Sequence, residues 1–320
     1  MRHLLLSVKR PFDTRAYLTL VGLLVPAVFA IQPYILTTTA IPSPGIWDLL
    51  LSGAIDLLLY SALGAAGFWF ASRTGLGMPL IEGWDKPESS RSRAPGVAGL
   101  SIVAGILLVL TKALDIAIAS LLVQAESAPA DAITVPAWQG LLAAFSAGTT
   151  EEVVFRLFGL TLLVWLGSLL FPSRTGRPAP GLLWAATILF ALLFGLGHLL
   201  GPVQAGIPLD ALSVIRTMVL NGLGGVLFGW LYWAFGLESA MLAHITADVV
   251  KLGLVPLVSQ QTGGTRRSIA GVLAGLVMLA VILWSVRAVL RDRKQFPPSV
   301  DSDPQQRTSD DEYPAEHAAA

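Results

Sequence analysis

Long apolar segments follow one another along almost the whole chain, and they constrain the fold more than any other feature of the sequence. A helix needs ~20 mostly apolar residues to cross a hydrocarbon core ~30 Å thick. The segments that meet this requirement are 16–36, 46–71, 96–122, a helix within 138–171, 181–200, 212–235, 237–258 and 269–290. The sequence therefore predicts an all-α fold, a polytopic membrane helix bundle with about eight transmembrane helices.

The composition agrees with a membrane environment and excludes several kinds of site. Only 13% of the residues are charged and 54% are hydrophobic, whereas a soluble domain carries roughly 25% charged residues. There is no cysteine, which excludes disulfides, thiolate metal sites and cysteine nucleophiles. The net charge is zero, which gives no reason to propose nucleic acid as a partner, whereas the apolar segments make membrane lipid an expected one.

One membrane domain and a short tail account for the chain. Residues 1–294 hold all the predicted spans and form the predicted polytopic membrane domain. Residues 295–320 are polar, contain four prolines and include the acidic pair Asp310-Asp311. Such a segment cannot bury a core, so we expect a disordered cytoplasmic tail.

The positions of lysine and arginine predict the orientation in the membrane. The N-terminal segment, the second and fourth loops and the end of the last helix carry Lys and Arg, whereas the first, third and fifth loops carry none. Because cytoplasmic loops are enriched in these residues, we expect a multi-pass protein of the cell membrane with both termini in the cytoplasm. Arg266 and Arg267 in the seventh loop are an exception. An N-terminal signal peptide ending near Ala30 is an alternative that fits the charge pattern less well.

The fourth predicted span carries the sequence Glu151-Glu152-x-x-x-Arg156. Ionisable groups at membrane depth are costly, so each needs an explanation. Glu152 and Arg156 are four residues apart and share a helix face, where they can form an ion pair. Glu151 points ~100° away and has no partner on its own helix, so it is a candidate to take a proton from water. In the alternative interpretation both acids only pair with cations for packing.

Two of the four histidines lie in other predicted spans. His3 and His317 are in the terminal segments, whereas His198 is in the fifth span and His244 in the seventh. A single buried histidine is usually a packed core residue. Two in separate spans, together with an unpaired Glu151 in a third, form the ligand or acid–base set that a hydrolytic site requires.

Asp248 lies four residues after His244, so the two side chains share a helix face. Lys251, three residues further on, competes for the Asp248 carboxylate. Asp248 is therefore a candidate site residue that has an alternative partner.

Three motifs, in this order and on these spans, resemble the CAAX prenyl protease and bacteriocin-processing (CPBP) family, also called the Abi family. The motifs are Glu151-Glu152-x-x-x-Arg156, Phe194-x-x-x-His198 and His244-x-x-x-Asp248. The motif-bearing core spans residues 138–258. The resemblance implies an intramembrane endopeptidase, a CAAX-type hydrolase often described as a metalloprotease, whose catalytic residues are Glu151, Glu152, Arg156, His198, His244 and Asp248.

The roles implied by this resemblance leave the chemistry open between two routes. Glu151 would be the general base for a water held near His198 and His244, while Glu152 and Arg156 would fix the helix and the orientation of Glu151. The histidines would either bind Zn²⁺ together with Glu151 or Asp248, or act without metal by positioning water and stabilising the tetrahedral intermediate.

One residue departs from the prenyl-protease pattern. Those proteases usually carry Asn where this chain has Asp248, and an ionised Asp cannot donate a hydrogen bond to a developing oxyanion. Asp248 would then ligate a metal, orient His244 or pair with Lys251.

The expected substrate is a membrane-associated or lipidated protein or peptide. The competing hypothesis is a non-catalytic membrane protein of the same fold, an immunity or scaffold factor, or a transporter. A transporter should show related halves or broken helices in matching positions, and none is evident. All the ionisable motif residues are present, which favours the enzyme.

Overall fold

The computed structural model describes residues 10–38, 44–83, 93–122, 135–173, 177–200 and 209–259, with five further residues between 280 and 287. In this part of the chain every regular element is a helix and there is no strand. Seven described segments are long and apolar enough to cross a membrane, so the predicted polytopic all-α bundle is confirmed. The eighth predicted span, 269–290, lies almost wholly outside the described residues, as does the predicted disordered tail.

Each of the seven spans matches one predicted from the sequence. The first consists of α1 (Thr14–Ala30) and α2 (Gln32–Thr38). The next two are α3 (Ile46–Thr74) and α5 (Ala94–Leu122), with the short α4 (Pro79–Glu82) between them. The fourth is the continuous run α6 (Ala137–Glu152), η2 (Val153–Leu160) and α7 (Thr161–Leu170). The last three are α8 (Pro180–Gly197), α10 (Ala211–Phe235), and α11 (Leu237–Asp248) continued by η3 (Val249–Leu254) and α12 (Val255–Ser259).

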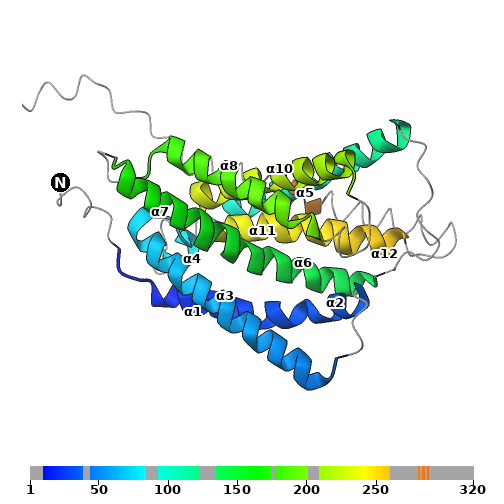
Figure 1. Ribbon diagram of the computed structural model, residues 1–320, viewed down its shortest axis with the longest axis horizontal. Helices are drawn as coiled ribbons and strands as arrows, with labels where there is room; N and C mark the ends of the chain where they lie inside the picture. Colours follow the sequence, from blue (N-terminus) through cyan, green and yellow to red (C-terminus); the bar gives the residue numbers. More distant parts are fainter. Residues whose placement is uncertain are drawn as a thin grey trace, which may run out of the picture.

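The α6–η2–α7 run passes through the middle of the bundle (Figure 1). On one side it contacts α1 and α3, and on the other it contacts α8, α10 and α11. The shared core consists of apolar side chains from these helices, including Leu20, Leu157, Phe228 and Leu231, which are all buried. Large apolar side chains of α3 and α8 are exposed on the outside of the bundle, as expected for surfaces that face lipid.

The fourth span is 34 residues long, which is longer than one crossing requires, as the sequence indicated. Its central part, Val153–Leu160, is π-helical and starts directly after Glu151 and Glu152. Short π-helical stretches inside α-helices are frequent at functional sites. The irregular stretch contains Arg156, so it sets the direction of that side chain relative to the two glutamates.

A glycine allows α8 and α10 to pack closely. A Cβ added at Gly225 would lie 2.6 Å from the Cα of Ala191, which is too close for any other residue without a shift of the backbone. Small residues at such contacts let membrane helices approach each other. The close contact brings the backbone of α10 within reach of side chains on the fourth span.

The start of α11 is fixed by the segment around α4. Glu238 Oε1 accepts hydrogen bonds from the backbone N–H groups of Leu80 and Ile81, at 3.0 Å each. Leu237 N donates to Gly77 O at 2.9 Å. We call residues 77–82 together with 236–239 the α4–α11 junction. It closes the end of the bundle at which α3 ends and α5 begins (Figure 1).

Candidate active site

His244 lies at the centre of the residues that the motifs predicted. It is buried on α11, and its Nδ1 is 2.8 Å from Oε1 of Glu152 on α6. A carboxylate accepts only, so the Nδ1–H donates and Glu152 fixes both the tautomer and the orientation of the ring. In the neutral ring, Nε2 then carries the free lone pair.

Glu152 also holds the predicted ion pair with Arg156. Arg156 Nη1 donates to Glu152 Oε1 at 3.1 Å, and both side chains are almost completely buried, with exposures of 1% and 0%. Arg156 Nη2 donates to the carbonyl oxygen of Gly225 at 3.3 Å. The predicted pairing of Glu152 with Arg156 is therefore confirmed. The contact of Glu152 with His244 was not predicted, because the two residues are far apart in sequence.

Glu151 approaches the other nitrogen of the same ring. Its Oε2 lies 4.0 Å from His244 Nε2, and a third of the side chain is exposed. Within the described residues, this buried oxygen has no hydrogen-bond partner. The two adjacent glutamates leave the helix in different directions, as expected, yet both reach His244, one at each ring nitrogen.

Asp248 contacts both of its candidate partners. Its Oδ2 lies 3.6 Å from His244 Nε2 and its Oδ1 lies 2.7 Å from Lys251 Nζ. The distance to His244 is long for a hydrogen bond, whereas the distance to Lys251 is that of a charge-assisted one. The alternatives drawn from the sequence are thus both present in one side chain.

His198 follows the last residue of α8 and is separated from His244 by an aromatic ring. Its Nδ1 is 2.8 Å from the carbonyl oxygen of Phe194, so this nitrogen carries the hydrogen and Nε2 is left free. The Phe194 ring centroid lies 4.5 Å from that of His198 and 5.8 Å from that of His244. Phe228 stacks on the other side of His244 at 4.6 Å. The two phenylalanines were not predicted to contact the site, since apolar residues in a span carry no distinguishing signal.

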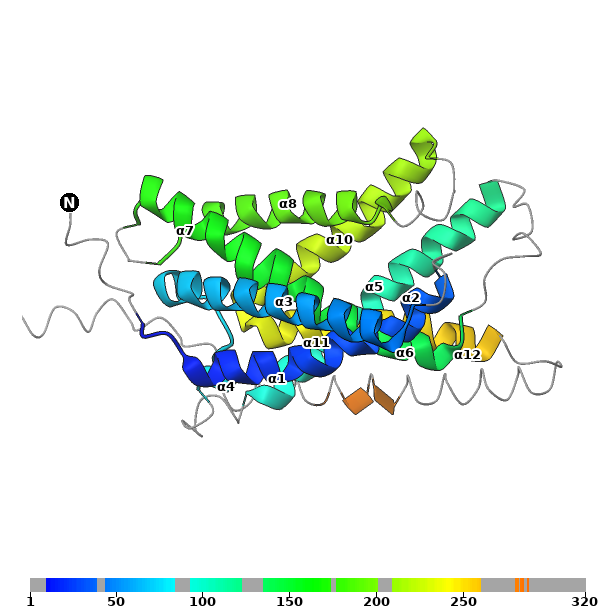
Figure 2. The same cartoon turned by 60° about the horizontal axis from the view of Figure 1, so that its bottom comes forward.

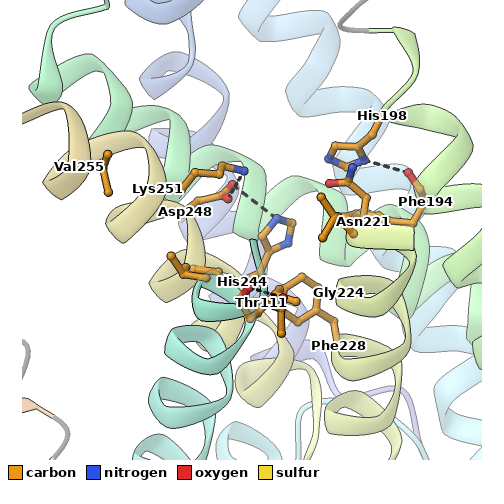
Figure 3. A pocket seen from close by; sticks show the side chains of 14 residues that line it. Thr111, Phe194, His198, Asn221, Gly224, Phe228, His244, Asp248, Lys251 and Val255 are labelled. Atoms are coloured by element: carbon orange, nitrogen blue, oxygen red, sulfur yellow. Dashed lines mark hydrogen bonds and ion pairs between the residues drawn. The ribbon is translucent and has the colours of Figure 1, made fainter. Parts of the chain in front are cut away.

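A cavity of about 330 Å³ connects the two histidines. Its wall is mostly apolar, and the polar side chains in it are those of Thr111, His198, Asn221, His244, Asp248 and Lys251 (Figure 3). Glu151 does not line this cavity; it reaches His244, which does. Asn221 was not predicted, because only ionisable groups in the spans were considered. Its Nδ2 donates to the Thr217 carbonyl at 2.9 Å, which leaves one amide N–H available to a ligand.

The Nε2 atoms of the two histidines are the nitrogens that would bind zinc, because metal-binding histidines commonly donate their other N–H to a carboxylate or a carbonyl. A catalytic zinc site requires three protein ligands around one point. Among the described residues, no three histidine or carboxylate side chains are grouped so as to hold a metal ion. The side chains therefore do not fit a preformed zinc site.

Comparison with known proteins gives one match. Residues 133–250 match the family described as type II CAAX prenyl endopeptidase Rce1-like, while no curated protein and no solved structure is significantly similar to the chain. The matched residues include all three motifs. They also include the side chains that contact His244, which are those of Glu151, Glu152, Phe194, Phe228 and Asp248. This segment is therefore similar to the Rce1-like family, a match consistent with the CPBP family, and the seven apolar helices of the described part indicate an integral membrane protein.

Proposed function

We propose that the protein is an intramembrane endopeptidase that hydrolyses a peptide bond of a membrane-associated or lipidated protein with water activated by Glu151. The observation that carries this proposal is the approach of Glu151 Oε2, which has no hydrogen-bond partner among the described residues, to Nε2 of His244. Glu151 Oε2 and His244 Nε2 lie 4.0 Å apart, a separation that one bridging water can span. The similarity of residues 133–250 to a family of endopeptidases supports the same reaction class.

In the proposed reaction, Glu151 removes a proton from this water while the oxygen attacks the carbonyl carbon of the scissile bond. The carbonyl oxygen becomes an oxyanion in the tetrahedral intermediate. Glu151 then gives the proton to the departing nitrogen, the C–N bond breaks, and a carboxylic acid and an amine are released. The glutamate ends the cycle in its starting form.

The neighbouring residues position the reacting groups. Glu152 holds His244 through Nδ1 and is itself held by Arg156, so the Nε2 that faces the water has a fixed direction. The oxyanion needs a hydrogen-bond donor, and Asp248 as a carboxylate cannot supply one. The free amide N–H of Asn221, in the wall of the same cavity, is a neutral donor that can take this role.

The non-catalytic alternative explains the site less well. A scaffold would require none of the contacts among Glu152, Arg156 and His244, and burying such charged groups is costly unless they serve a purpose. The zinc route lacks a third ligand among the described residues. We therefore favour glutamate-activated water over both.

The experiment that tests the proposal compares the parent protein with Glu151→Gln in proteoliposomes that contain membrane-anchored peptide reporters. Glutamine keeps the shape and removes the base, so we expect cleavage to fall by ~10²–10⁴-fold, the range typical of a general base. Glu238→Gln is a matched control, since it changes a buried glutamate outside the site. Cleavage by Glu151→Gln at the parent rate would show that the proposal is wrong.

A chelator added to the same reactions separates the two chemistries. We expect cleavage to continue unchanged in its presence. Loss of cleavage that is restored by added Zn²⁺ would overturn the metal-free route and leave the peptidase function standing.

A further inference from the structure

We propose that Tyr60 of α3 is a positioning residue for the hydrolysis: its hydroxyl anchors the helical turn that carries Glu151 and so keeps that carboxylate directed at Nε2 of His244. This inference rests on the proposed function and adds a residue that none of the three motifs contains. Three features support it: the register of α3 against the fourth span, the polar contact at the Tyr60 hydroxyl and the change of helix type directly after the two glutamates.

α3 packs closely against the π-helical part of the fourth span. Figure 2 shows α3 crossing the middle of that span, and the two are in contact along η2. A Cβ added at Gly67 would lie 2.8 Å from the carbonyl oxygen of Leu157, and one added at Gly64 would lie 4.0 Å from Cγ1 of Val153. Because the numbers of the paired residues increase together, α3 and the fourth span run in the same direction with a defined register.

The same register brings Tyr60 to the turn that carries Glu151. Tyr60 precedes Gly64 by four residues, so both lie on one face of α3. Thr150 precedes Val153 by three residues and lies on the corresponding face of the fourth span. Toward their N-terminal ends the two helices diverge (Figure 1), so only a long side chain can bridge them there. Tyr60 is such a side chain, and it packs against the core with part of its surface exposed.

The Tyr60 hydroxyl makes a polar contact between the two helices. It forms a hydrogen bond with the side chain of Thr150. Thr150 Oγ1 donates its own hydrogen to the carbonyl oxygen of Ser146 at 2.9 Å, so in the contact with Tyr60 it accepts and the tyrosine hydroxyl donates. The charges of Glu151 and of Asp56, which lies one turn before Tyr60 on α3, also act on this hydroxyl. The hydroxyl is therefore a polar bridge from α3 to the fourth span beside the carboxylate of the base.

The turn that carries Glu151 ends where the helix type changes. Residues up to Glu152 are α-helical, and Val153 begins the π-helical stretch, in which each backbone hydrogen bond spans one residue more. A displacement by one residue along a helix turns a side chain by ~100°. Glu151 Oε2 has no hydrogen-bond partner among the described residues that would hold it at 4.0 Å from Nε2 of His244. Its direction therefore depends on how the adjacent Thr150 is held.

Two side-chain contacts hold this turn from different sides of the span. Glu152 is bonded to His244 on α11, and Thr150 is bonded to Tyr60 on α3. With both contacts in place, the turn is fixed against rotation about the helix axis, and the direction of Glu151 is fixed with it. Loss of the Tyr60 hydroxyl leaves the contact with α11 alone, so the Glu151 carboxylate moves away from the water beside His244.

Cleavage kinetics in proteoliposomes test the role of the hydroxyl. Tyr60→Phe keeps the ring and removes the donor, and Thr150→Val removes the acceptor at nearly the same volume. In each variant kcat per folded molecule should fall by ~10-fold or more, up to the ~10²-fold that a misplacement of ~1 Å can cost, while KM stays at the parent value. Thr150→Ser keeps the acceptor and should cleave like the parent. The double variant Tyr60→Phe/Thr150→Val should cleave no more slowly than the slower single variant, because the two groups form one contact.

Tyr232 provides a matched control, because its hydroxyl also bonds to a threonine of the fourth span. The hydroxyl oxygens of Tyr232 and Thr161 lie 2.6 Å apart, and both side chains are buried. Tyr232→Phe should lower the unfolding temperature and leave kcat and KM per folded molecule unchanged. An equal fall of kcat in Tyr60→Phe and Tyr232→Phe would show that the Tyr60 hydroxyl serves helix packing alone and would overturn the inference. A parent-like kcat in Tyr60→Phe would overturn it too.

Infrared difference spectra distinguish a failure of this inference from a failure of the proposed function. Subtraction of the Glu151→Gln spectrum from that of the parent gives the carboxylate bands of Glu151 without any substrate. The same difference should show shifted bands in the Tyr60→Phe background and unshifted bands in the Tyr232→Phe background. If the parent cuts no reporter, the proposed peptidase function fails, and shifted bands still show that Tyr60 positions Glu151. Unshifted bands in the Tyr60→Phe background overturn the positioning role, whether or not the protein cleaves peptides.

Discussion

The two ends of α11 each hold a buried glutamate site, and the two sites differ in the partners of the carboxylate. At the α4–α11 junction, Glu238 accepts two backbone N–H groups. Six residues further along α11, His244 meets Glu152, whose partners are a ring nitrogen and the Arg156 guanidinium. Glu238, Glu151 and Glu152 each also have a buried oxygen with no hydrogen-bond partner among the described residues. The carboxylates of Glu151 and Glu152 lie beside the ring nitrogens of His244, whereas the other oxygen of Glu238 is held by backbone N–H groups. Burial and an unpartnered oxygen therefore do not identify a catalytic base; the facing group does.

Removal of Arg156 should produce the largest effect, because it disrupts the group of side chains around His244 and lowers stability as well. Arg156→Met leaves Glu152 buried without its cation, which typically costs ~3–5 kcal/mol for a buried pair. We expect this loss in apparent unfolding free energy in detergent, together with loss of cleavage. The double variant Glu152→Gln/Arg156→Met removes both charges and should recover most of the stability without recovering cleavage. A single variant as stable as the parent would show that the pair does not hold the site together.

Substitution of Asn221 tests whether its amide is the oxyanion donor of the site around His244. If the amide N–H serves the oxyanion, Asn221→Ala should lower kcat by ~10²–10³-fold, as for other single donors, with little change in KM. Thermal stability should hardly change, because the hydrogen-bond partner of the amide in the described part of the chain is a carbonyl within the same helix. A variant that changes KM and leaves kcat intact would assign Asn221 to substrate binding instead.

Glu238 is expected to respond in the opposite way. Glu238→Ala leaves the partly buried N–H groups of Leu80 and Ile81 without an acceptor, which costs up to ~1–3 kcal/mol, the range for a buried group. The unfolding temperature should fall while kcat, measured below that temperature, stays at the parent value. Glu238→Gln keeps an oxygen acceptor and should lose less. A fall in kcat without a fall in stability would break the distinction between the two sites.

The same comparison explains what the sequence could predict. The seven spans that the structure describes were predicted correctly because hydropathy is a property of continuous segments. The Glu152–Arg156 pair was predicted because it follows from helix periodicity. The contact between Glu152 and His244 depends on how the fourth span packs against α11, which no local pattern encodes. Phe194 was noted only as part of its motif, and its position between the two histidines follows from the packing of α8. Asn221 carries a signal that was available, an amide inside a span.

The smallest effects concern two carboxylates outside the spans, one at each end of the bundle. Burial raises the pKa of Glu82, at the α4–α11 junction, above its ordinary value of 4.5. A carboxyl with a raised pKa stabilises the fold most when it is protonated. Its contribution to the free energy of unfolding is therefore fully present below about pH 4.5 and is lost as the pH rises through the raised pKa. Asp210, at the opposite end, accepts a backbone hydrogen bond from Ser213, which lowers the pKa of its carboxyl below the ordinary 3.8. The contribution of Asp210 to the free energy of unfolding is therefore fully present above about pH 3.8 and is lost as the pH falls through the lowered pKa.

The two carboxylates therefore make the stability of the two ends depend on pH with opposite signs. Unfolding temperatures measured from acidic to neutral pH should fall less steeply in Glu82→Gln than in the parent as the pH rises. In Asp210→Asn, which keeps a helix-capping side chain, they should fall less steeply as the pH drops. Both shifts should be small beside that of Arg156→Met, because Asp210 is exposed and Glu82 is only partly buried. The cleavage rate per folded molecule should not change with pH in the way that either unfolding temperature does, since neither residue contacts the side chains around His244. A cleavage profile that shifts with Glu82→Gln would instead couple the α4–α11 junction to the catalytic group through α11.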